Sequence, residues 1–219
     1  MRLVVIIALS IFMFSCSVAP QKIDVPNIDK SSLVLVKDVR PESEKEREIF
    51  SAHVFKEEYG INRVGDQVIT PGPMRLFQHR IYEKYQNESK LPKVTVYHFV
   101  VYSNMTKELK RMSAGIMFGG VLGALVGSIG SDSTVSEEAK LTTEEDFNSV
   151  EKEYYRGFYT EEENPDGASI FKVYIDAELD GERKFISLMA PTKLEEGDER
   201  PPYVVAIERA IKYYLEQYE

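Results

Sequence analysis

The sequence predicts an α+β fold, in which an antiparallel or mixed sheet carries two amphipathic helices on one face. Three observations lead to this fold class: a long β-branched segment in mid-chain, a hairpin pattern near residue 180, and two segments with helical spacing. Their order along the chain is strand, strand, helix, strand, hairpin and helix, which is typical of helices packed against one face of a sheet. A glycine-rich apolar helix is expected as an insertion in this fold.

Three segments read as single strands, and one of them is residues 49–58, in which Phe50, Ala52 and Val54 alternate loosely with polar residues. Residues 33–39 (LVLVKDV) are rich in β-branched residues and end at Arg40-Pro41, which predicts a short strand. Residues 93–103 (KVTVYHFVVYS) are largely apolar at both odd and even positions, which indicates a central strand covered on both sides. Strict alternation along this strand places five side chains on one face: Val94, Val96, His98, Val100 and Tyr102.

The hairpin pattern runs from residue 171 to residue 186. Apolar and polar residues alternate up to Leu179, and Asp180-Gly181 suits a two-residue turn. That turn sets Glu178 opposite Arg183 on the polar face and Ile175 opposite Ile186 inside.

Two segments have the spacing of amphipathic helices. The first follows Thr70 and Pro71 and ends near Asn87. His79 is not part of its apolar stripe, so we expect His79 at the surface. The second begins at Pro201-Pro202 and closes the chain. The stripe of the first helix is Met74, Phe77, Ile81 and Tyr85, and that of the second is Val204, Ile207, Ile211, Tyr214 and Tyr218.

The N-terminus has the pattern of a secretory signal peptide over residues 1–15. Arg2 gives a positive start, and an uncharged apolar segment then runs to Phe14. The sequence Met13-Phe14-Ser15-Cys16 resembles the lipobox of bacterial lipoproteins, which implies that Cys16 receives diacylglycerol and a further acyl chain such as palmitate. Cys16 is the one cysteine of the chain, and lipidation accounts for it. A plain signal peptide with an unused thiol and an uncleaved anchor helix are the alternatives.

The resemblance to lipoproteins also implies a location. Ser17, rather than Asp, follows the cysteine, and by the sorting rule of Gram-negative lipoproteins this favours the outer membrane. We therefore expect a lipid-anchored protein of the bacterial cell envelope that faces the periplasm.

Composition divides the remaining chain into five parts. Residues 16–31 are expected to form the lipidated cysteine and a tether, and residues 32–105 the first part of the α+β domain. Residues 106–131 form a glycine-zipper segment, residues 132–168 an acidic connector, and residues 169–219 the hairpin and helix that complete the domain.

The charge of the chain is concentrated in one region. The formal net charge is −9, and the segment from Asp132 to Asp166 alone holds twelve acidic and three basic residues. This balance argues against nucleic acid, and against an anionic membrane surface, as the main partner. The acidic segment is interpreted as a solvated connector or as a docking surface for a basic partner.

The glycine-zipper segment is the most distinctive pattern in the sequence. Residues 112–130 carry no charge, and Gly115, Gly119, Gly123 and Gly127 recur every fourth residue. On a helix these glycines share one face and form a smooth groove that a second helix backbone can approach closely. Such a helix would be about 28 Å long, close to the ~30 Å of a bilayer core.

This segment resembles the glycine zippers of bacterial surface antigens and membrane-associated lipoproteins. The resemblance implies contact with a membrane, with a second copy of the chain or with another envelope protein. Burial in the domain, cover for a groove, and a mobile loop are the alternatives that the pattern leaves open.

The Asp38-Val39-Arg40-Pro41 strand end and the closing strand–helix pattern resemble the periplasmic domains of outer-membrane lipoproteins of the YajG type. The resemblance covers about 150 residues and implies a compact α+β domain.

The sequence holds no recognisable catalytic constellation. His53, His79 and His98 match no metal spacing, no hydrolase or phosphate-loop motif is present, and Cys16 is assigned to the lipid. We expect no cofactor and no enzyme activity. The first hypothesis is a noncatalytic envelope lipoprotein that oligomerises or docks through its glycine-zipper helix, in the assembly or maintenance of an outer-membrane structure. The alternative is a periplasmic lipid- or peptide-binding module, with the apolar segment as groove cover.

Overall fold

The computed structural model describes residues 20–50, 60–104, 136–152, 170–191 and 200–218, together with Thr160, Glu162, Glu163 and Pro165. The predicted signal peptide, Cys16 and the predicted glycine-zipper segment lie outside these residues.

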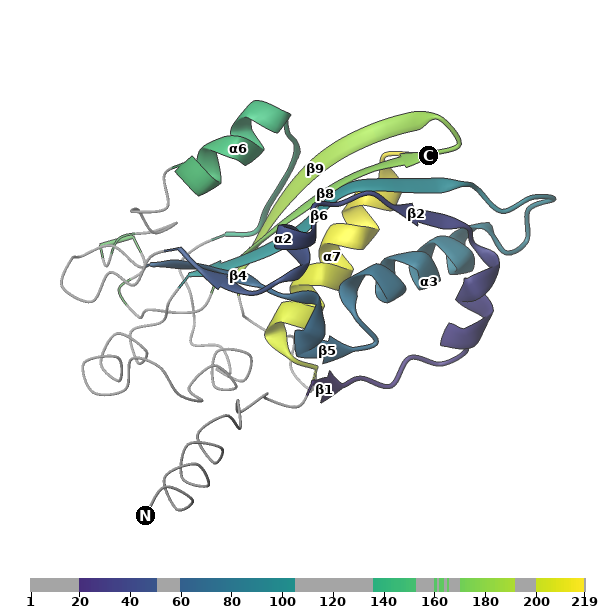
Figure 1. Cartoon of the computed structure of the whole chain (residues 1–219), viewed down its shortest axis with the longest axis horizontal. Coiled ribbons are helices and arrows are strands. Elements are labelled where there is room, and N and C mark those ends of the chain that lie inside the picture. Colours follow the sequence, from purple (N-terminus) through teal and green to yellow (C-terminus); the bar gives the residue numbers. More distant parts are fainter. Residues whose placement is uncertain are drawn as a thin grey trace, which may run out of the picture.

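The described residues form a mostly antiparallel seven-stranded sheet with two long helices on one face, which confirms the α+β class (Figure 1). The strand order is β3-β4-β6-β8-β9-β7, and β2 pairs parallel to β6. The strands are β2 (Val36–Asp38), β3 (Glu48–Ile49), β4 (Ile61–Val64), β6 (Val94–Asn104), β7 (Glu138–Leu141), β8 (Ile170–Leu179) and β9 (Glu182–Pro191). The long helices are α3 (Pro73–Tyr85) and α7 (Pro202–Glu216).

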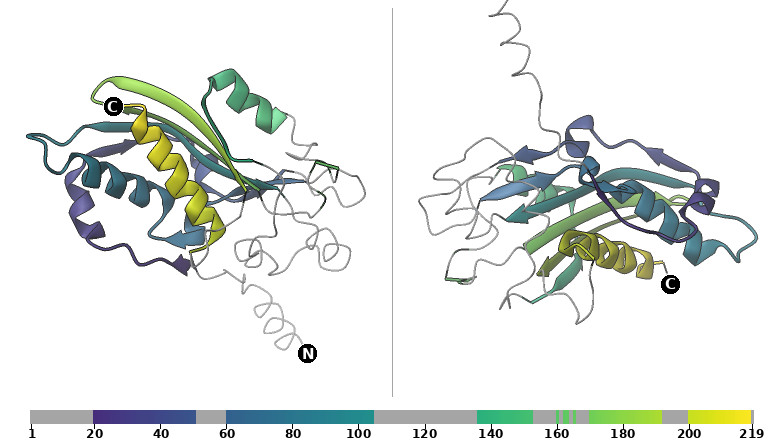
Figure 2. Two further views of the ribbon diagram at one scale, coloured as in Figure 1. Left: turned by 180° about the vertical axis from the view of Figure 1, so that it is seen from behind. Right: turned by 90° about the horizontal axis from the view of Figure 1, so that it is seen from below.

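The main core lies between the sheet and these two helices (Figure 2). The apolar stripes predicted from helical spacing face this core, and Phe77, Ile81, Ile207 and Ile211 are fully buried in it. His79, which was expected at the surface, is buried as well. That prediction was wrong because the packed surface of α3 is wider than its apolar stripe.

The β8–β9 hairpin has the predicted register. Glu178 pairs with Arg183 and Ile175 with Ile186, and the turn residues Asp180 and Gly181 both have positive φ, as this tight turn requires. The ion pair across the hairpin nevertheless runs diagonally, because Arg183 binds Asp176 through two hydrogen bonds.

Strand β6 departs from strict alternation at one residue. Its pairing with β8 shifts between Val96 and His98, so Tyr97 forms a β-bulge. A bulge adds one residue to one strand, so every residue after it points to the face opposite to the one that strict alternation predicts. The predicted faces are therefore wrong beyond Val96: Phe99 and Val101 join the main core, whereas His98 lies on the other face.

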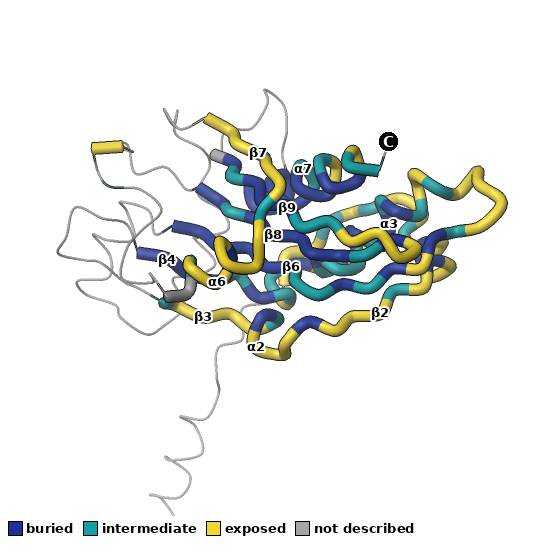
Figure 3. Tube along the Cα trace, turned by 90° about the horizontal axis from the view of Figure 1, so that it is seen from above, coloured by how far each residue is buried: buried dark blue, intermediate teal, exposed yellow. Residues whose placement is uncertain are grey.

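The opposite face of the sheet carries a second, smaller core. Its members are Ile61, Val100, Tyr102, Phe147 and Tyr174. Two short helices, α2 (Glu42–Lys45) and α6 (Glu144–Lys152), lie over this face (Figure 3). We call it the outer face.

Most of the expected tether is part of the domain. Strand β1 (Gln21–Lys22) pairs with β5 (Ile69–Thr70), and a 3-10 helix, η1 (Ile28–Leu33), follows. Ile23 and Val25 pack against the main core. From residue 21 onward the segment therefore differs from the expected tether, because its apolar side chains have a surface to cover.

The acidic connector also contributes to the domain. Strand β7 pairs with β9, and α6 follows it. The Thr143 hydroxyl accepts a hydrogen bond from the backbone N–H of Asp146, which caps the start of α6, and Phe147 buries its ring on the outer face. The buried Phe147 ring and the Thr143 cap thus stabilise a helix that the acidic composition did not predict.

Arg40 fills a gap between two strands. β2 pairs with the first half of β6 and β4 with the second half, so none of the strands that the structure describes covers the edge of β6 between them. The Arg40 guanidinium occupies this gap, donates to the Phe99 carbonyl oxygen at 3.0 Å, and binds both carboxylate oxygens of Asp38 and of Asp66. This is the structural role of the Asp38–Pro41 motif. The strand expected over residues 33–39 is correspondingly short.

Candidate functional site

The described strands are joined to the glycine-zipper segment at one end of the sheet. β6 ends at Asn104, beside the start of β8 and the end of β9, because Ser103 pairs with Phe171 and Phe171 with Ala190. β7 begins at the same end, since Glu138 pairs with Met189. We call this the loop end; it lies opposite the β8–β9 turn (Figure 1).

Buried polar groups close the loop end. The Asn104 side chain is fully buried, and its Oδ1 accepts a hydrogen bond from the backbone N–H of Ile170 at 2.5 Å. Asn62 of β4 pairs with Ser103, and its side-chain amide nitrogen is buried without a partner among the described residues. The buried Tyr203 hydroxyl of α7 likewise has no partner among them. The Asn104 contact ties β6 to β8 at the point where the zipper segment leaves the sheet.

The outer face holds a buried histidine–carboxylate pair. His98 Nδ1 lies 2.6 Å from Glu44 Oε1, and the Glu44 carboxylate is almost completely buried. Burial by itself would lower the pKa of His98. The hydrogen bond and charge of Glu44, together with the charges of Asp176 and Glu144, outweigh it and leave this pKa raised above its ordinary value.

Helix α6 is held to the outer face through this histidine. The Phe147 ring lies 4.7 Å from the His98 ring, and the Phe185 ring lies 5.9 Å from it, both between ring centres. His98 therefore contacts α2 through Glu44 and α6 through Phe147. This arrangement joins two peripheral helices to the central strand.

The described contacts of His98 on the outer face are with the Glu44 carboxylate and with aromatic rings. Within the described ranges, no group of three or more His, Cys, Asp or Glu side chains is placed to hold a metal ion. Glu44 orients His98, but the ring is packed between phenylalanines rather than beside a hydroxyl nucleophile. The cross-strand neighbour of His98 on β8 is Asp176, which is already bound to Arg183.

The histidine pair makes stability depend on pH. A histidine whose pKa is raised in the folded state stabilises the fold fully below its unfolded pKa, and this contribution is lost as the pH rises through the folded pKa. We expect urea denaturation to show that the wild type loses stability relative to His98→Gln as the pH rises above the ordinary histidine pKa of about 6.5. Glu44→Gln should reduce this pH dependence, because it removes the carboxylate that contributes most to raising the pKa of His98. A wild-type advantage that grows with pH would contradict the assignment.

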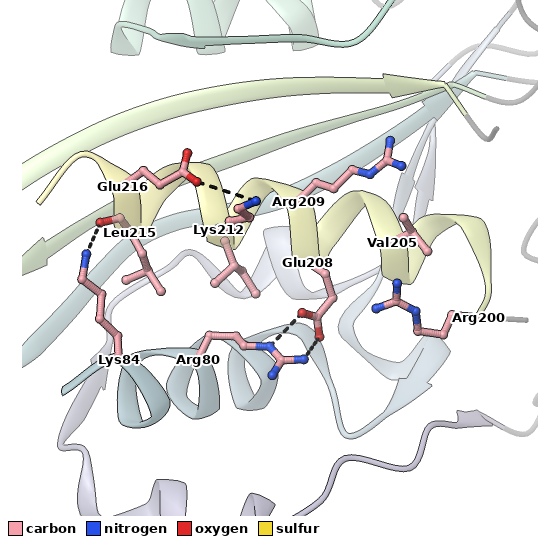
Figure 4. A pocket seen from close by; sticks show the side chains of 10 residues that line it. Arg80, Lys84, Arg200, Val205, Glu208, Arg209, Lys212, Leu215 and Glu216 are labelled. Carbon is pink, nitrogen blue, oxygen red and sulfur yellow. Dashed lines mark hydrogen bonds and ion pairs between the residues drawn. The ribbon is translucent and has the colours of Figure 1, made fainter. Parts of the chain in front are cut away.

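A second site is a groove between α3 and α7 on the helical face (Figure 4). Two contacts join the helices along it. Arg80 binds both carboxylate oxygens of Glu208, and the Lys84 ammonium donates to the Leu215 carbonyl oxygen. The groove is lined largely by charged side chains.

The structure tests few of the predicted site residues directly. Cys16 and the four zipper glycines Gly115, Gly119, Gly123 and Gly127 lie outside the described residues. None of the helices that the structure describes is long and apolar enough to cross a membrane. The Glu44–His98 pair was missed, since a single Glu in the charged segment 42–48 gives no sign of burial. The Thr143 cap followed by Phe147 was the available signal for α6.

No family model, curated protein or solved structure matches this chain. The assignment of function therefore rests on the sequence patterns and on the geometry of the domain.

Proposed function

We propose that this chain is a noncatalytic envelope lipoprotein, anchored through lipid at Cys16, whose α+β domain presents the glycine-zipper segment for docking. The partner is a second copy of the chain or another envelope protein. The protein would serve in the assembly or maintenance of an outer-membrane structure and face the periplasm.

One observation carries this proposal: the zipper segment leaves and re-enters the sheet at the same end. β6 ends at Asn104 and β7 begins at Glu138, and both positions lie at the loop end. The zipper is thus an excursion from one end of a packed domain rather than a link between two separate bodies.

Chain length then argues against a single membrane span. If residues 112–130 crossed a bilayer as one helix, residues 131–137 would have to return the chain to the domain. Seven extended residues reach about 25 Å, which is less than the ~30 Å hydrocarbon core. An extended segment in lipid would also leave its backbone groups unpaired. These constraints favour a protein contact or a shallow membrane contact.

The spacing of the glycines suits a protein contact. Four glycines on one helical face let a second helix approach within van der Waals distance. In water each glycine costs about 0.8–1.0 kcal/mol of helix stability relative to alanine, so the helix needs a partner to form. The alternative, in which the segment covers a ligand groove, has less support from the described domain, because its α3–α7 groove is rimmed by charged side chains.

The experiment is a paired substitution on the two faces of the zipper. Gly119→Leu and Gly123→Leu fill the smooth face, and we expect them to shift the native complex to a smaller size, measured by blue-native electrophoresis and by mass photometry. Val121→Leu on the opposite side is the matched control and should leave the complex unchanged.

Circular dichroism would establish that both variants keep the domain folded. If the glycine variants and the control give complexes of the same size as the wild type, the zipper is not the docking element.

A further inference from the structure

The groove between α3 and α7 has a positively charged lining, although the chain as a whole has a negative net charge. It encloses about 660 Å³. Its cationic lining residues are Arg80, Lys84, Arg200, Arg209 and Lys212, and its acidic ones are Glu208 and Glu216. The lining thus has a net charge of +3, whereas the whole chain has −9. The groove is complementary to a negatively charged ligand.

The cations of the groove differ in how firmly they are held. Arg80 is bound by Glu208 and by Glu83, and it serves mainly to join the two helices. Arg209 of α7 is paired with Glu137 at the surface. The Lys212 ammonium lies 3.9 Å from a carboxylate oxygen of Glu216, and the Lys212 side chain is 79 % exposed. Exposed pairs of this kind contribute little to stability, so a stronger anion can displace their carboxylates at small cost.

The floor of the groove is apolar. Val205, Ile211 and Leu215 line it along one side of α7. Figure 4 shows Arg80, Lys84 and Arg200 on the α3 side of this helix and Arg209 on the opposite side. The three apolar side chains of the floor are almost completely buried, so a ligand in the groove meets mainly the charged side chains at its rim.

The groove also lies at the side of the domain from which the chain runs toward its N-terminus. β1 pairs with β5, and both lie beside the start of α7 (Figure 1). Arg200 lies two residues before Pro202, the first residue of α7. A domain tethered at Cys16 would consequently carry the Arg200 end of the groove near the lipid surface.

We propose that this groove binds the headgroup of an anionic glycerophospholipid. The guanidinium of Arg209 and the ammonium of Lys212, three residues apart on α7, would hold the phosphate, since arginine presents paired N–H donors to phosphate oxygens. The inference rests on the proposed lipid anchor, because a chain of charge −9 is repelled by an anionic surface unless a tether raises its local concentration.

The test uses soluble lipids, so that membrane insertion by the zipper segment plays no part. The mature chain, secreted with Cys16→Ser so that no lipid is attached, is titrated below micelle formation with dihexanoyl-phosphatidylglycerol and separately with dihexanoyl-phosphatidylcholine. We expect the anionic lipid to shift the amide NMR signals of Val205, Arg209 and Lys212, and the zwitterionic lipid to leave them in place.

A charge-matched pair of variants shows where binding occurs. Arg209→Glu with Lys212→Glu should weaken binding of the anionic lipid by about tenfold or more, as expected for the loss of charge-assisted hydrogen bonds. Lys90→Glu with Lys93→Glu makes the same charge change on exposed residues of the α3–β6 connection and should leave the affinity unchanged.

Three results would overturn the proposal. Equal binding of both lipids would show that headgroup charge is not recognised. Equal loss in both double variants would indicate diffuse electrostatics rather than the groove. Inorganic phosphate that binds as tightly as the anionic lipid would identify a phosphate site. The readout is independent of complex size, so failure of the zipper proposal would leave it unaffected.

Discussion

Replacing Arg40 with Met should lower the free energy of unfolding by about 3–5 kcal/mol, the cost expected when one member of a buried ion pair is removed. The Arg40 side chain is 1 % exposed and lies between the carboxylates of Asp38 and Asp66. It also binds the Phe99 carbonyl, which none of the described strands reaches. Without the guanidinium, two carboxylates face each other and a backbone oxygen in the middle of β6 loses its partner.

Urea denaturation followed by circular dichroism would measure this effect. Lys45→Met is the matched control, because Lys45 makes ion pairs with Glu42 and Asp38 at the surface, and its replacement should cost far less than that of Arg40. A cost for Arg40→Met no larger than that of the control would show that the gap between β2 and β4 does not need the arginine.

Phe77→Ala should destabilise the domain by about 3–5 kcal/mol, as for other buried aromatic residues that are truncated to alanine. Phe77 on α3 is fully buried, and its ring packs edge-on against Phe99 of β6 at 5.9 Å and against Tyr214 of α7 at 5.3 Å, between ring centres. It is the one side chain among these three elements that contacts both others in this way.

Thermal and urea unfolding of Phe77→Ala and Phe77→Leu would separate lost volume from lost aromatic contacts. Leucine keeps most of the apolar volume and should cost less than alanine. If alanine is tolerated with a loss below about 1 kcal/mol, the core between α3, α7 and the sheet is not packed as described.

The sequence predicts those parts of the fold in which local pattern and tertiary packing agree. Asp180-Gly181 fixes the hairpin register because only a tight turn with positive φ joins two such strands. The stripe from Val204 to Tyr214 predicts the buried face of α7 because helical spacing and burial coincide there. Proline at the start of each long helix marks its N-terminus.

The errors occur where a distant contact decides the local structure. The bulge at Tyr97 interrupts a run of β-branched and aromatic residues that reads as continuous, and it moves His98 to the other face. Arg40 has no local partner beyond Asp38, and its second carboxylate comes from Asp66. Helix α6 lies in a strongly acidic segment, and the burial of Phe147 beside His98 fixes it.

The candidate sites divide in the same way. The four-residue glycine spacing is visible in the sequence, but the position of the zipper at the loop end follows from the pairing of β6, β8, β9 and β7. The α3–α7 groove draws its cations from two helices more than a hundred residues apart, and no local motif joins Arg80 to Arg209.

Under the proposed function, both ends of the zipper segment lie on the same side of the membrane as the domain. Lipidation would block the thiol of Cys16, the one cysteine of the chain, so single cysteines can be placed at will. Lys107→Cys, Asp132→Cys and, in the domain, Lys90→Cys would each be treated with a membrane-impermeant maleimide after reconstitution of the lipidated protein into vesicles. We predict that all three label to the same extent without detergent. If the cysteine at position 107 or at position 132 labels only after the vesicles are dissolved, the segment spans the membrane, and the two ends do not lie on the same side.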